Sequence, residues 1–213
     1  MSHPLQNRVD PWSDFHANPS RLATRMGNRG ILHNEKQEIV RAWKSKAWVC
    51  CRMQFNGIQR TVFQVEPKLS YSELFFLDEA VALAVGHRPC NDCQRDRLKA
   101  FKLAWWAANR SETPAKEVLI SEIDDQLHNE RTTSDRRKVT FDAPAHSLPV
   151  GPMFAHDRSA FLVTSAGLYL WSFNGYTRAS PPASETVKVL TPQSIVATLR
   201  EGYVPAFHPS VDS

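Results

Sequence analysis

The sequence predicts an α+β fold, with a mixed module of helices and strands in roughly the first half and a small antiparallel β-rich domain in the second. Apolar residues recur at helical spacing in several segments before residue 131, whereas strand-like runs after residue 138 alternate with Gly, Asn, Pro and Ser turns. We expect four parts: an irregular N-terminal arm (1–20), a mixed α+β module (21–109), a connecting helix (117–131) and a β-rich domain with a terminal helix (138–205).

The first part of the module is expected to hold a turn, a helix and a hairpin. Three arginines around Gly27 and Gly30 indicate a flexible basic turn. The apolar spacing from Glu35 to Trp43 predicts a short helix. Asn56-Gly57 separates two extended runs, 47–55 and 59–65, and this dipeptide is typical of a β-hairpin.

The following segment has the most complete local signals. Residues 73–77 form an apolar run that predicts a buried strand. Asp78 is suited to cap a helix through Val85, and Gly86 is suited to end it with a left-handed residue. After Cys93, a second helix is expected to bury one apolar face, made of Leu98, Phe101 and Trp105.

The remaining elements follow from periodicity and from residues that start or stop helices. Thr113-Pro114 predicts the start of a third helix, which is expected to bury Leu119, Ile123 and Leu127. Strand-like runs at 153–155, 160–163, 168–171 and 186–190 predict a small antiparallel sheet or barrel. A final helix at 192–200 is expected to be capped by Thr191 and stopped at Gly202.

Composition limits the classes of protein to which the chain can belong. Only four cysteines occur in 213 residues, which is too few for a disulfide scaffold and favours a reducing compartment. Neither an apolar signal segment nor a run of about 18 apolar residues is present, so we expect a cytoplasmic protein without membrane spans. The net charge of +4 is compatible with an anionic partner but does not establish one.

Cys90 and Cys93 are the strongest functional signal, because C-x2-C spacing lets two sulfurs bind one tetrahedral Zn²⁺ ion. The same spacing serves redox-active thiols, but the preceding helix and Arg88-Pro89 disfavour a thioredoxin arrangement.

A third ligand is expected from Cys50 or Cys51, whose side chains point to opposite faces of a strand. Cys51 is preferred because it shares its face with Val49 and Met53. The fourth ligand is expected to be a histidine, a carboxylate or water, with His33 as the candidate and His87 as a poorer one.

Residues 70–94 resemble the zinc-binding module of Ada-type DNA methylphosphotriester repair proteins. The resemblance lies in a strand, Asp78-Glu79-Ala80, Gly86 and the run Arg88-Pro89-Cys90-x-x-Cys93-Gln94. It implies an Ada-like or treble-clef-like zinc module in which Cys90 and Cys93 correspond to the second thiolate pair. The first pair of that family, C-x3-C, is not found here, so we expect no methyl transfer to this chain. The whole chain also resembles an uncharacterised bacterial protein family, which implies no activity.

These observations predict a zinc protein that binds nucleic acid, with a role in DNA repair or processing. Two alternatives remain open: a zinc-dependent hydrolase or nuclease with an open metal position, and a structural zinc module for protein interaction. Walker A, G-x-G-x-x-G, H-E-x-x-H and G-x-S-x-G motifs are all missing, which disfavours several common enzyme classes. The residues expected to contact phosphate are Arg29, Arg88, Arg95 and Arg97.

Overall fold

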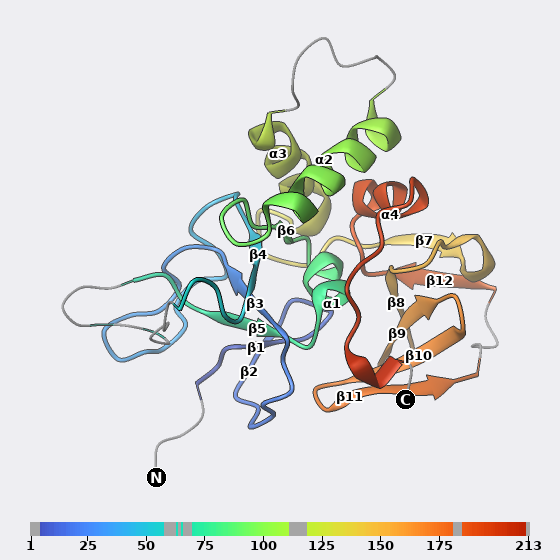
Figure 1. Cartoon of the computed structure of the whole chain (residues 1–213). Coiled ribbons are helices and arrows are strands. Elements are labelled where there is room, and N and C mark those ends of the chain that lie inside the picture. Colours follow the sequence, from blue (N-terminus) through green and yellow to red (C-terminus); the bar gives the residue numbers. More distant parts are fainter. Residues whose placement is uncertain are drawn as a thin grey trace.

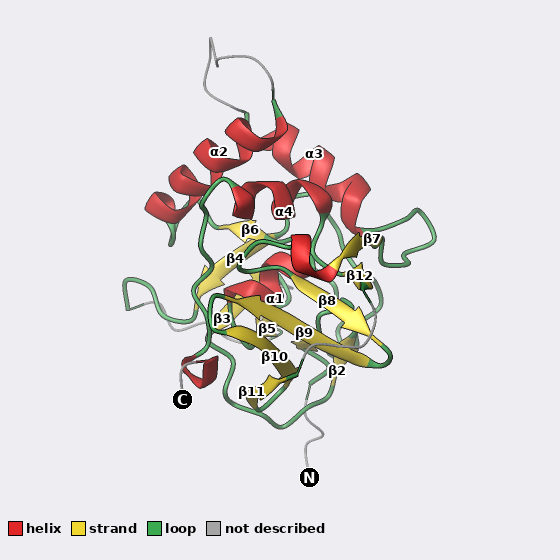
Figure 2. Cartoon of the chain, turned by 90° about the vertical axis from the view of Figure 1, so that its right-hand side faces the viewer, coloured by secondary structure: helices red, strands yellow, loops and turns green. Residues whose placement is uncertain are grey.

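The computed structural model describes residues 5–57, 63, 65, 70–110, 119–180 and 185–211. Within these residues the chain forms two six-stranded sheets and four α-helices, which confirms the α+β class. Helix α1 (Glu79–Ala84) lies between the two sheets, and the other three helices gather at one end of the molecule (Figures 1 and 2). The helices at that end are α2 (Arg95–Asn109), α3 (Ile120–Arg131) and α4 (Gln193–Arg200).

The first sheet has the strand order β2-β1-β5-β3-β4-β6. Its strands are β1 (Arg8–Val9), β2 (Phe15–His16), β3 (Arg25–Asn28), β4 (Val49–Arg52), β5 (Leu74–Phe76) and β6 (Arg88–Pro89). The segment expected to be an irregular arm therefore contributes two strands, and the middle of the expected basic turn forms strand β3. At Gly27 a Cβ atom would lie only 2.4 Å from the Phe76 ring, so the close contact between β3 and β5 requires glycine.

The Asn-Gly turn has the expected backbone, but strand β4 pairs elsewhere. Asn56 and Gly57 have φ values of 51° and 68°. Strand β4 pairs antiparallel with β3 and parallel with β6. Most of the run predicted to pair with it, 59–65, lies outside the described residues.

Helices α1 and α2 form as their local signals predict. The Asp78 carboxylate accepts the Val81 N–H at 3.0 Å and so caps α1. Gly86 has a φ of 83° and follows the end of that helix. Leu98, Phe101 and Trp105 are buried on the inner face of α2.

The helix predicted at 35–43 does not form. The Asn34 Oδ1 atom accepts the N–H groups of Lys36 and Glu38, each at 3.0 Å, and so holds a turn that competes with a helix. His33 and Ile39 then meet in an isolated β-bridge. The helix predicted from the spacing of Ile39, Val40 and Trp43 was therefore wrong, because the hydrogen bonds of the Asn34 side chain stabilise a turn instead.

Helix α3 is shorter than the predicted apolar stripe. Ile123 and Leu127 are buried as expected, but Leu119 is 62% exposed because it precedes the first helical turn as the N-cap residue. The predicted start at Thr113-Pro114 lies outside the described residues.

The second sheet is antiparallel throughout and has the order β11-β10-β9-β8-β12-β7. The four predicted strand runs are confirmed as β8, β9, β10 and β12, whereas β7 and β11 were not predicted. Its strands are β7 (Phe141–Pro144), β8 (Met153–His156), β9 (Ser159–Thr164), β10 (Gly167–Ser172), β11 (Gly175–Ala179) and β12 (Thr186–Val189).

Two short 3-10 helices and α4 complete the C-terminal part. The 3-10 helices are η1 (Ala145–Ser147) and η2 (Pro209–Val211). The N-cap of α4 is Pro192 rather than Thr191, whose Oγ1 atom instead accepts the Met153 N–H at 2.9 Å. Gly202, with a φ of 94°, follows α4 as predicted.

The two sheets share their hydrophobic core. One buried cluster joins Val81 of α1 to Leu162 and Tyr176 of the second sheet. Hydrogen bonds reinforce this contact: the Tyr176 hydroxyl donates to Asp78 at 3.1 Å, and the Ala206 N–H donates to Glu79 at 2.9 Å. In the part of the chain that the structure describes, no helix combines the length and the apolarity needed to cross a membrane.

Candidate metal centre

Three cysteine side chains from two separate segments meet at one point of the first sheet. Cys51 comes from β4, and Cys90 and Cys93 come from the turn between β6 and α2. Their Sγ atoms all lie within 4.8 Å of one another, and all three residues are buried. Sulfurs bound to one tetrahedral Zn²⁺ ion at about 2.3 Å would be roughly 3.8 Å apart. These three buried cysteines can therefore hold a metal ion.

Backbone pairing between β4 and β6 brings the segments together. Strand β6 runs parallel to β4, with Cys50 opposite Pro89. The Cys50 carbonyl accepts the Cys90 N–H at 2.9 Å and the Gln94 side-chain amide at 2.7 Å. The turn that carries Cys90 and Cys93 is thus anchored at both ends to the strand that carries Cys51.

Strand alternation decides which of the two adjacent cysteines joins the group. Cys51 packs with Met26, Cys90 and Cys93 in one buried cluster. Cys50 points to the other face of the sheet, where it is fully buried beside Leu74 and Phe76. The structure therefore places Cys51, and not Cys50, beside the C-x2-C pair.

The three thiols have unequal acidities. The pKa of Cys90 is lowered to about 5, first by a hydrogen bond from the Cys51 thiol and further by the N–H groups of Cys93 and Asp92. The same bond and burial raise the pKa of Cys51. Burial also raises the pKa of Cys93, although the Arg52 N–H donates to its sulfur at 3.3 Å. Without a cation only one of the three carries its negative charge readily, so a metal ion is needed to hold all three as thiolates.

The two candidate histidines lie outside this three-sulfur group. His33 is buried, with Nδ1 2.6 Å from Ser72 Oγ and its ring stacked on Phe63. His87 is also buried, and its Nε2 accepts the Arg29 Nε–H at 3.3 Å. The structure does not bring the predicted fourth ligand, His33, to the cysteines. Among the described His, Cys, Asp and Glu residues, this group has three members.

Apolar and aromatic side chains surround the sulfurs. The partly buried residues packed against the cysteine cluster are Val49, Phe55, Tyr71 and Phe75. Such a shell limits water access and strengthens interactions between a bound cation and its thiolates. A fourth ligand would enter past these side chains.

Two of the four arginines expected to contact phosphate lie inside the protein. Arg29 is 1% exposed, and its guanidinium lies 3.8 Å from the centre of the Trp48 ring. Arg88 is buried and forms a two-point ion pair with Asp124. Neither guanidinium reaches the surface. Contact with the Trp48 ring offsets the cost of desolvating Arg29, and the ion pair with Asp124 offsets that of Arg88.

The other two expected arginines lie on α2. Arg95 is exposed, whereas Arg97 pairs with the buried Glu79 and donates to the Val204 carbonyl at 2.9 Å. The four predicted residues therefore do not form one basic surface.

A different group of arginines lies in and beside the first sheet, and one of them, Arg8, adjoins the cysteine cluster. Arg8 lies 4.5 Å above the ring of Phe75, which packs against the cysteines. Burial and the neighbouring charge of Arg21 lower the pKa of Arg8. Arg52 follows Cys51 and is paired across the strands with Arg25, so these two side chains lie on the face of the sheet to which Cys50 points. None of these four arginines forms an ion pair with a carboxylate in the described part of the chain.

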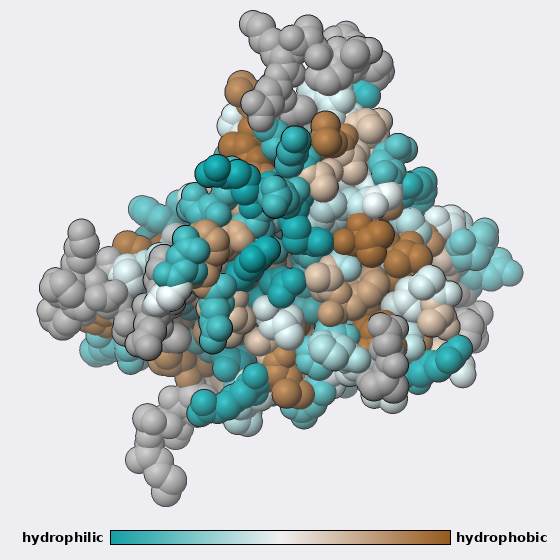
Figure 3. All heavy atoms as spheres, viewed as in Figure 1, coloured by the Kyte–Doolittle hydropathy of each residue, from teal (hydrophilic) through white to brown (hydrophobic). Residues whose placement is uncertain are grey.

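Only part of this arginine group could be recognised from the sequence. Arg21 and Arg25 stood out beside Gly27, but only strand pairing brings Arg8 to Phe75 and Arg52 to Arg25. Hydrophilic residues crowd the surface over β4, β6 and the start of α2 (Figure 3).

No protein-family model, curated protein or solved structure matches this chain.

Proposed function

We propose that the chain is a zinc protein whose metal module binds nucleic acid. The observation that carries this proposal is the meeting of three buried thiols from β4 and the β6–α2 turn, in a sheet whose strands also carry Arg8, Arg25 and Arg52, none of which pairs with a carboxylate among the described residues. Thiolate-rich tetrahedral sites favour Zn²⁺ or iron–sulfur clusters, and a mononuclear group of three sulfurs fits Zn²⁺ better.

The arginine group supports an anionic partner. Two arginines in cross-strand register, Arg25 and Arg52, repel each other unless an anion lies between them or solvent screens them. Arg8 and Arg21 extend the positive charge toward β1. Partly buried Phe75 and Tyr71 add rings on which bases can stack. Backbone phosphates with adjacent bases match both features.

Metal content tests the first half of the proposal. We expect about one zinc per chain by elemental analysis, and loss of zinc from the Cys51→Ala, Cys90→Ala and Cys93→Ala variants. Cys50→Ala is the matched control, because its sulfur points away from the group. Iron in place of zinc, or full zinc in the Cys90→Ser, Cys93→Ser double variant, would contradict the proposal.

Salt dependence of binding tests the second half. Fluorescence anisotropy with single- and double-stranded DNA should show affinity that falls steeply with salt. Arg8→Gln and Arg52→Gln should each reduce the slope of log K against log salt by about one. Arg158→Gln, an exposed change in the turn between β8 and β9, should leave the slope unchanged. No association at low salt would exclude nucleic acid as the partner.

A second candidate is hydrolysis of a phosphodiester. It is favoured because the described residues supply three protein ligands, which is the number found in catalytic zinc sites with one open position. Zinc in such a site activates a bound water molecule. Zinc-dependent turnover of bis(p-nitrophenyl) phosphate, lost in Cys93→Ala and kept in Cys50→Ala, would support this candidate.

A further inference from the structure

Four basic side chains gather in the interior, where α1, β6 and the end of α3 meet. Arg29 and Arg131 are each 1% exposed, and their guanidinium carbons lie 3.8 and 4.0 Å from the centre of the Trp48 ring. His87 is fully buried and accepts the Arg29 Nε–H. Lys138 is partly buried and lies close enough to both arginines for their charges to affect its pKa. We call these four residues the basic cluster.

The positive charge of the basic cluster has no carboxylate partner. None of its three cations forms an ion pair with a described residue. Of the neighbouring carboxylates, Asp10 accepts two backbone N–H groups and contacts the His16 ring, and Asp14 is exposed to solvent. Both oxygens of Asp124 bind Arg88. Cations buried without a compensating charge are costly, and a small bound anion would remove that cost.

Buried N–H groups of the basic cluster also lack acceptors. Burial and the charge of Arg29 lower the pKa of His87, so its ring is neutral, and because Nε2 accepts a hydrogen bond the proton lies on Nδ1. Neither this Nδ1–H nor the Arg131 Nε–H has a partner among the described residues. Lys138 donates one of its three ammonium hydrogens to the Ala84 carbonyl at 2.7 Å. Three side chains thus offer donors to an anion.

The acidities of the cluster agree with an excess of positive charge. Burial, followed by the charge of Arg29, lowers the pKa of Lys138 to about 7. Burial also lowers the pKa of Arg131 to about 9. A negative charge bound among these groups would raise both pKa values, because it favours the protonated forms. Anion binding and protonation of Lys138 are therefore linked.

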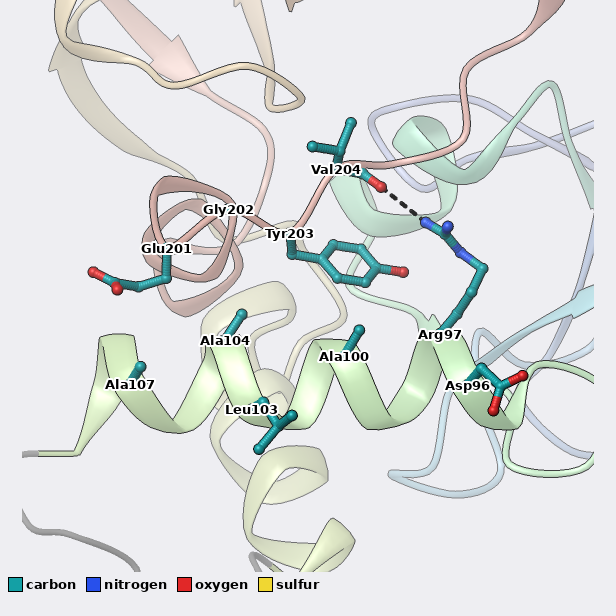
Figure 4. Close-up of a pocket in the computed structure, with 10 residues that line it drawn as sticks. All are labelled: Asp96, Arg97, Ala100, Leu103, Ala104, Ala107, Glu201, Gly202, Tyr203 and Val204. Carbon is teal, nitrogen blue, oxygen red and sulfur yellow. Dashed lines mark hydrogen bonds between the residues drawn. The ribbon is translucent and has the colours of Figure 1, made fainter.

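The groove between α2 and the segment after α4, with a volume of about 660 Å³, has a different character (Figure 4). Among the described residues that line it, Arg97 is the one basic side chain, and it already binds Glu79 and the Val204 carbonyl. The groove therefore offers no cation to an anion, in contrast to the basic cluster.

We propose that the basic cluster binds a small inorganic anion, held by His87 Nδ1–H, Arg131 Nε–H and the Lys138 ammonium group. Both arginines are buried too deeply to reach the backbone of a nucleic acid, so the ligand is an ion that enters past the partly exposed Lys138. Arg131 also donates to the Gly86 carbonyl at 2.7 Å, which places the anion beside the segment that leads into β6. The site is independent of metal and nucleic-acid binding.

Chloride NMR line widths and urea unfolding of the full chain test the proposal. Chloride is titrated against gluconate, a much larger anion, at constant ionic strength. We expect saturable broadening of the chloride signal and a free energy of unfolding that rises with the same dependence on chloride, because the folded chain alone holds the site. Inorganic phosphate is titrated in the same way. Saturable binding of either ion supports the proposal, and binding of neither overturns it.

Lys138→Met locates the anion. This change keeps the side-chain stem but removes the ammonium group, and it should weaken binding by about tenfold. Lys188→Met is the matched control, because Lys188 is exposed and pairs with Asp142 on the second sheet. Binding that Lys138→Met leaves unchanged would overturn the assigned site.

The pH dependence of binding gives a second readout in the unchanged protein. Raising the pH from 6 to 8 should weaken binding by about tenfold, because Lys138 loses its proton in this range while Arg131 keeps its charge. Lys138→Met should lack this component, so the difference between the two proteins separates Lys138 from the nearby Asp10 and Asp14. The same pH dependence in both proteins would contradict a role for Lys138.

Discussion

Arg88 and Asp124 form a two-point ion pair in the interior, with Nε–Oδ1 and Nη2–Oδ2 distances of 2.8 Å each. Arg88 lies in β6, two residues before Cys90, and Asp124 lies in α3. The pair therefore connects the cysteine turn to a helix that begins about thirty residues later in the chain.

Asp124→Asn is expected to destabilise the protein by about 3 kcal/mol and to weaken metal binding. The substitution leaves the Arg88 charge buried without its counter-ion, and the strand that holds Cys90 loses its support. Urea unfolding and zinc competition with a chelator measure the two effects. Asp125→Asn is the control, because Asp125 pairs with Lys46 at the surface and should change the free energy of unfolding by less than about 0.5 kcal/mol. Equal effects of the two variants would contradict this role of Asp124.

Local sequence signals were sufficient to predict the helices that flank the cysteine turn. The cap at Asp78, the stop at Gly86 and the apolar face of α2 each depend on residues close in sequence, and all were predicted. The segment 35–43 was misread because Asn34 forms backbone hydrogen bonds that a periodicity argument does not weigh.

The arginines show why the binding surface could not be predicted. Burial of Arg88 depends on Asp124, and burial of Arg29 depends on Trp48 and His87, all of them distant in sequence. An arginine expected at the surface can thus become part of the core when a remote partner offsets its desolvation.

The choice between Cys50 and Cys51 also depended on tertiary structure. Cys50 and Cys51 are both buried, so burial does not distinguish them. The argument that Met53 turns its face of the strand inward was wrong, because Met53 is 39% exposed. The decisive fact is that the C-x2-C turn lies on the side of β4 to which Cys51 points.

Asp78 is expected to make the free energy of unfolding depend on pH. Burial raises its pKa from 3.8 to about 6, against the hydrogen bonds from the Val81 and His208 N–H groups and the Tyr176 hydroxyl. A raised pKa means that the folded chain binds a proton more tightly than the unfolded chain does. The stabilisation of the folded chain by protonated Asp78 is therefore fully present below about pH 4, and it is lost as the pH rises through about 6. Its total is about 3 kcal/mol, since one pKa unit corresponds to about 1.4 kcal/mol.

Urea unfolding between pH 4 and 7 in the unchanged protein and in Asp78→Asn isolates this contribution. The difference between the two free energies should change by about 3 kcal/mol across the range, in the sense that the unchanged protein gains relative stability toward acid. A constant difference would show that the Asp78 carboxyl titrates alike in the folded and unfolded chains.

Cys90 is expected to be the most reactive thiol of the metal-free protein at pH 6.5. Its pKa of about 5 leaves it as thiolate there, while the pKa of Cys51 is raised by their shared hydrogen bond. Limited iodoacetamide labelling followed by peptide mass spectrometry measures the order of reaction. Bound zinc should protect all three cysteines of the group. Cys50 labelled before Cys90 would contradict the assigned acidities.

Zinc-loaded protein is expected to gain no methyl group from DNA that contains a methylphosphotriester. The resemblance to Ada-type modules implies four thiolates, whereas three thiolates on Zn²⁺ leave one net negative charge and less electron density on each sulfur. A C-x3-C pair that began at Cys51 would place its second cysteine at residue 55, where Phe55 instead packs against the cluster. Intact mass measurement after incubation tests the expectation, and a single methyl group on Cys51 would establish transfer to this strand despite the missing fourth sulfur.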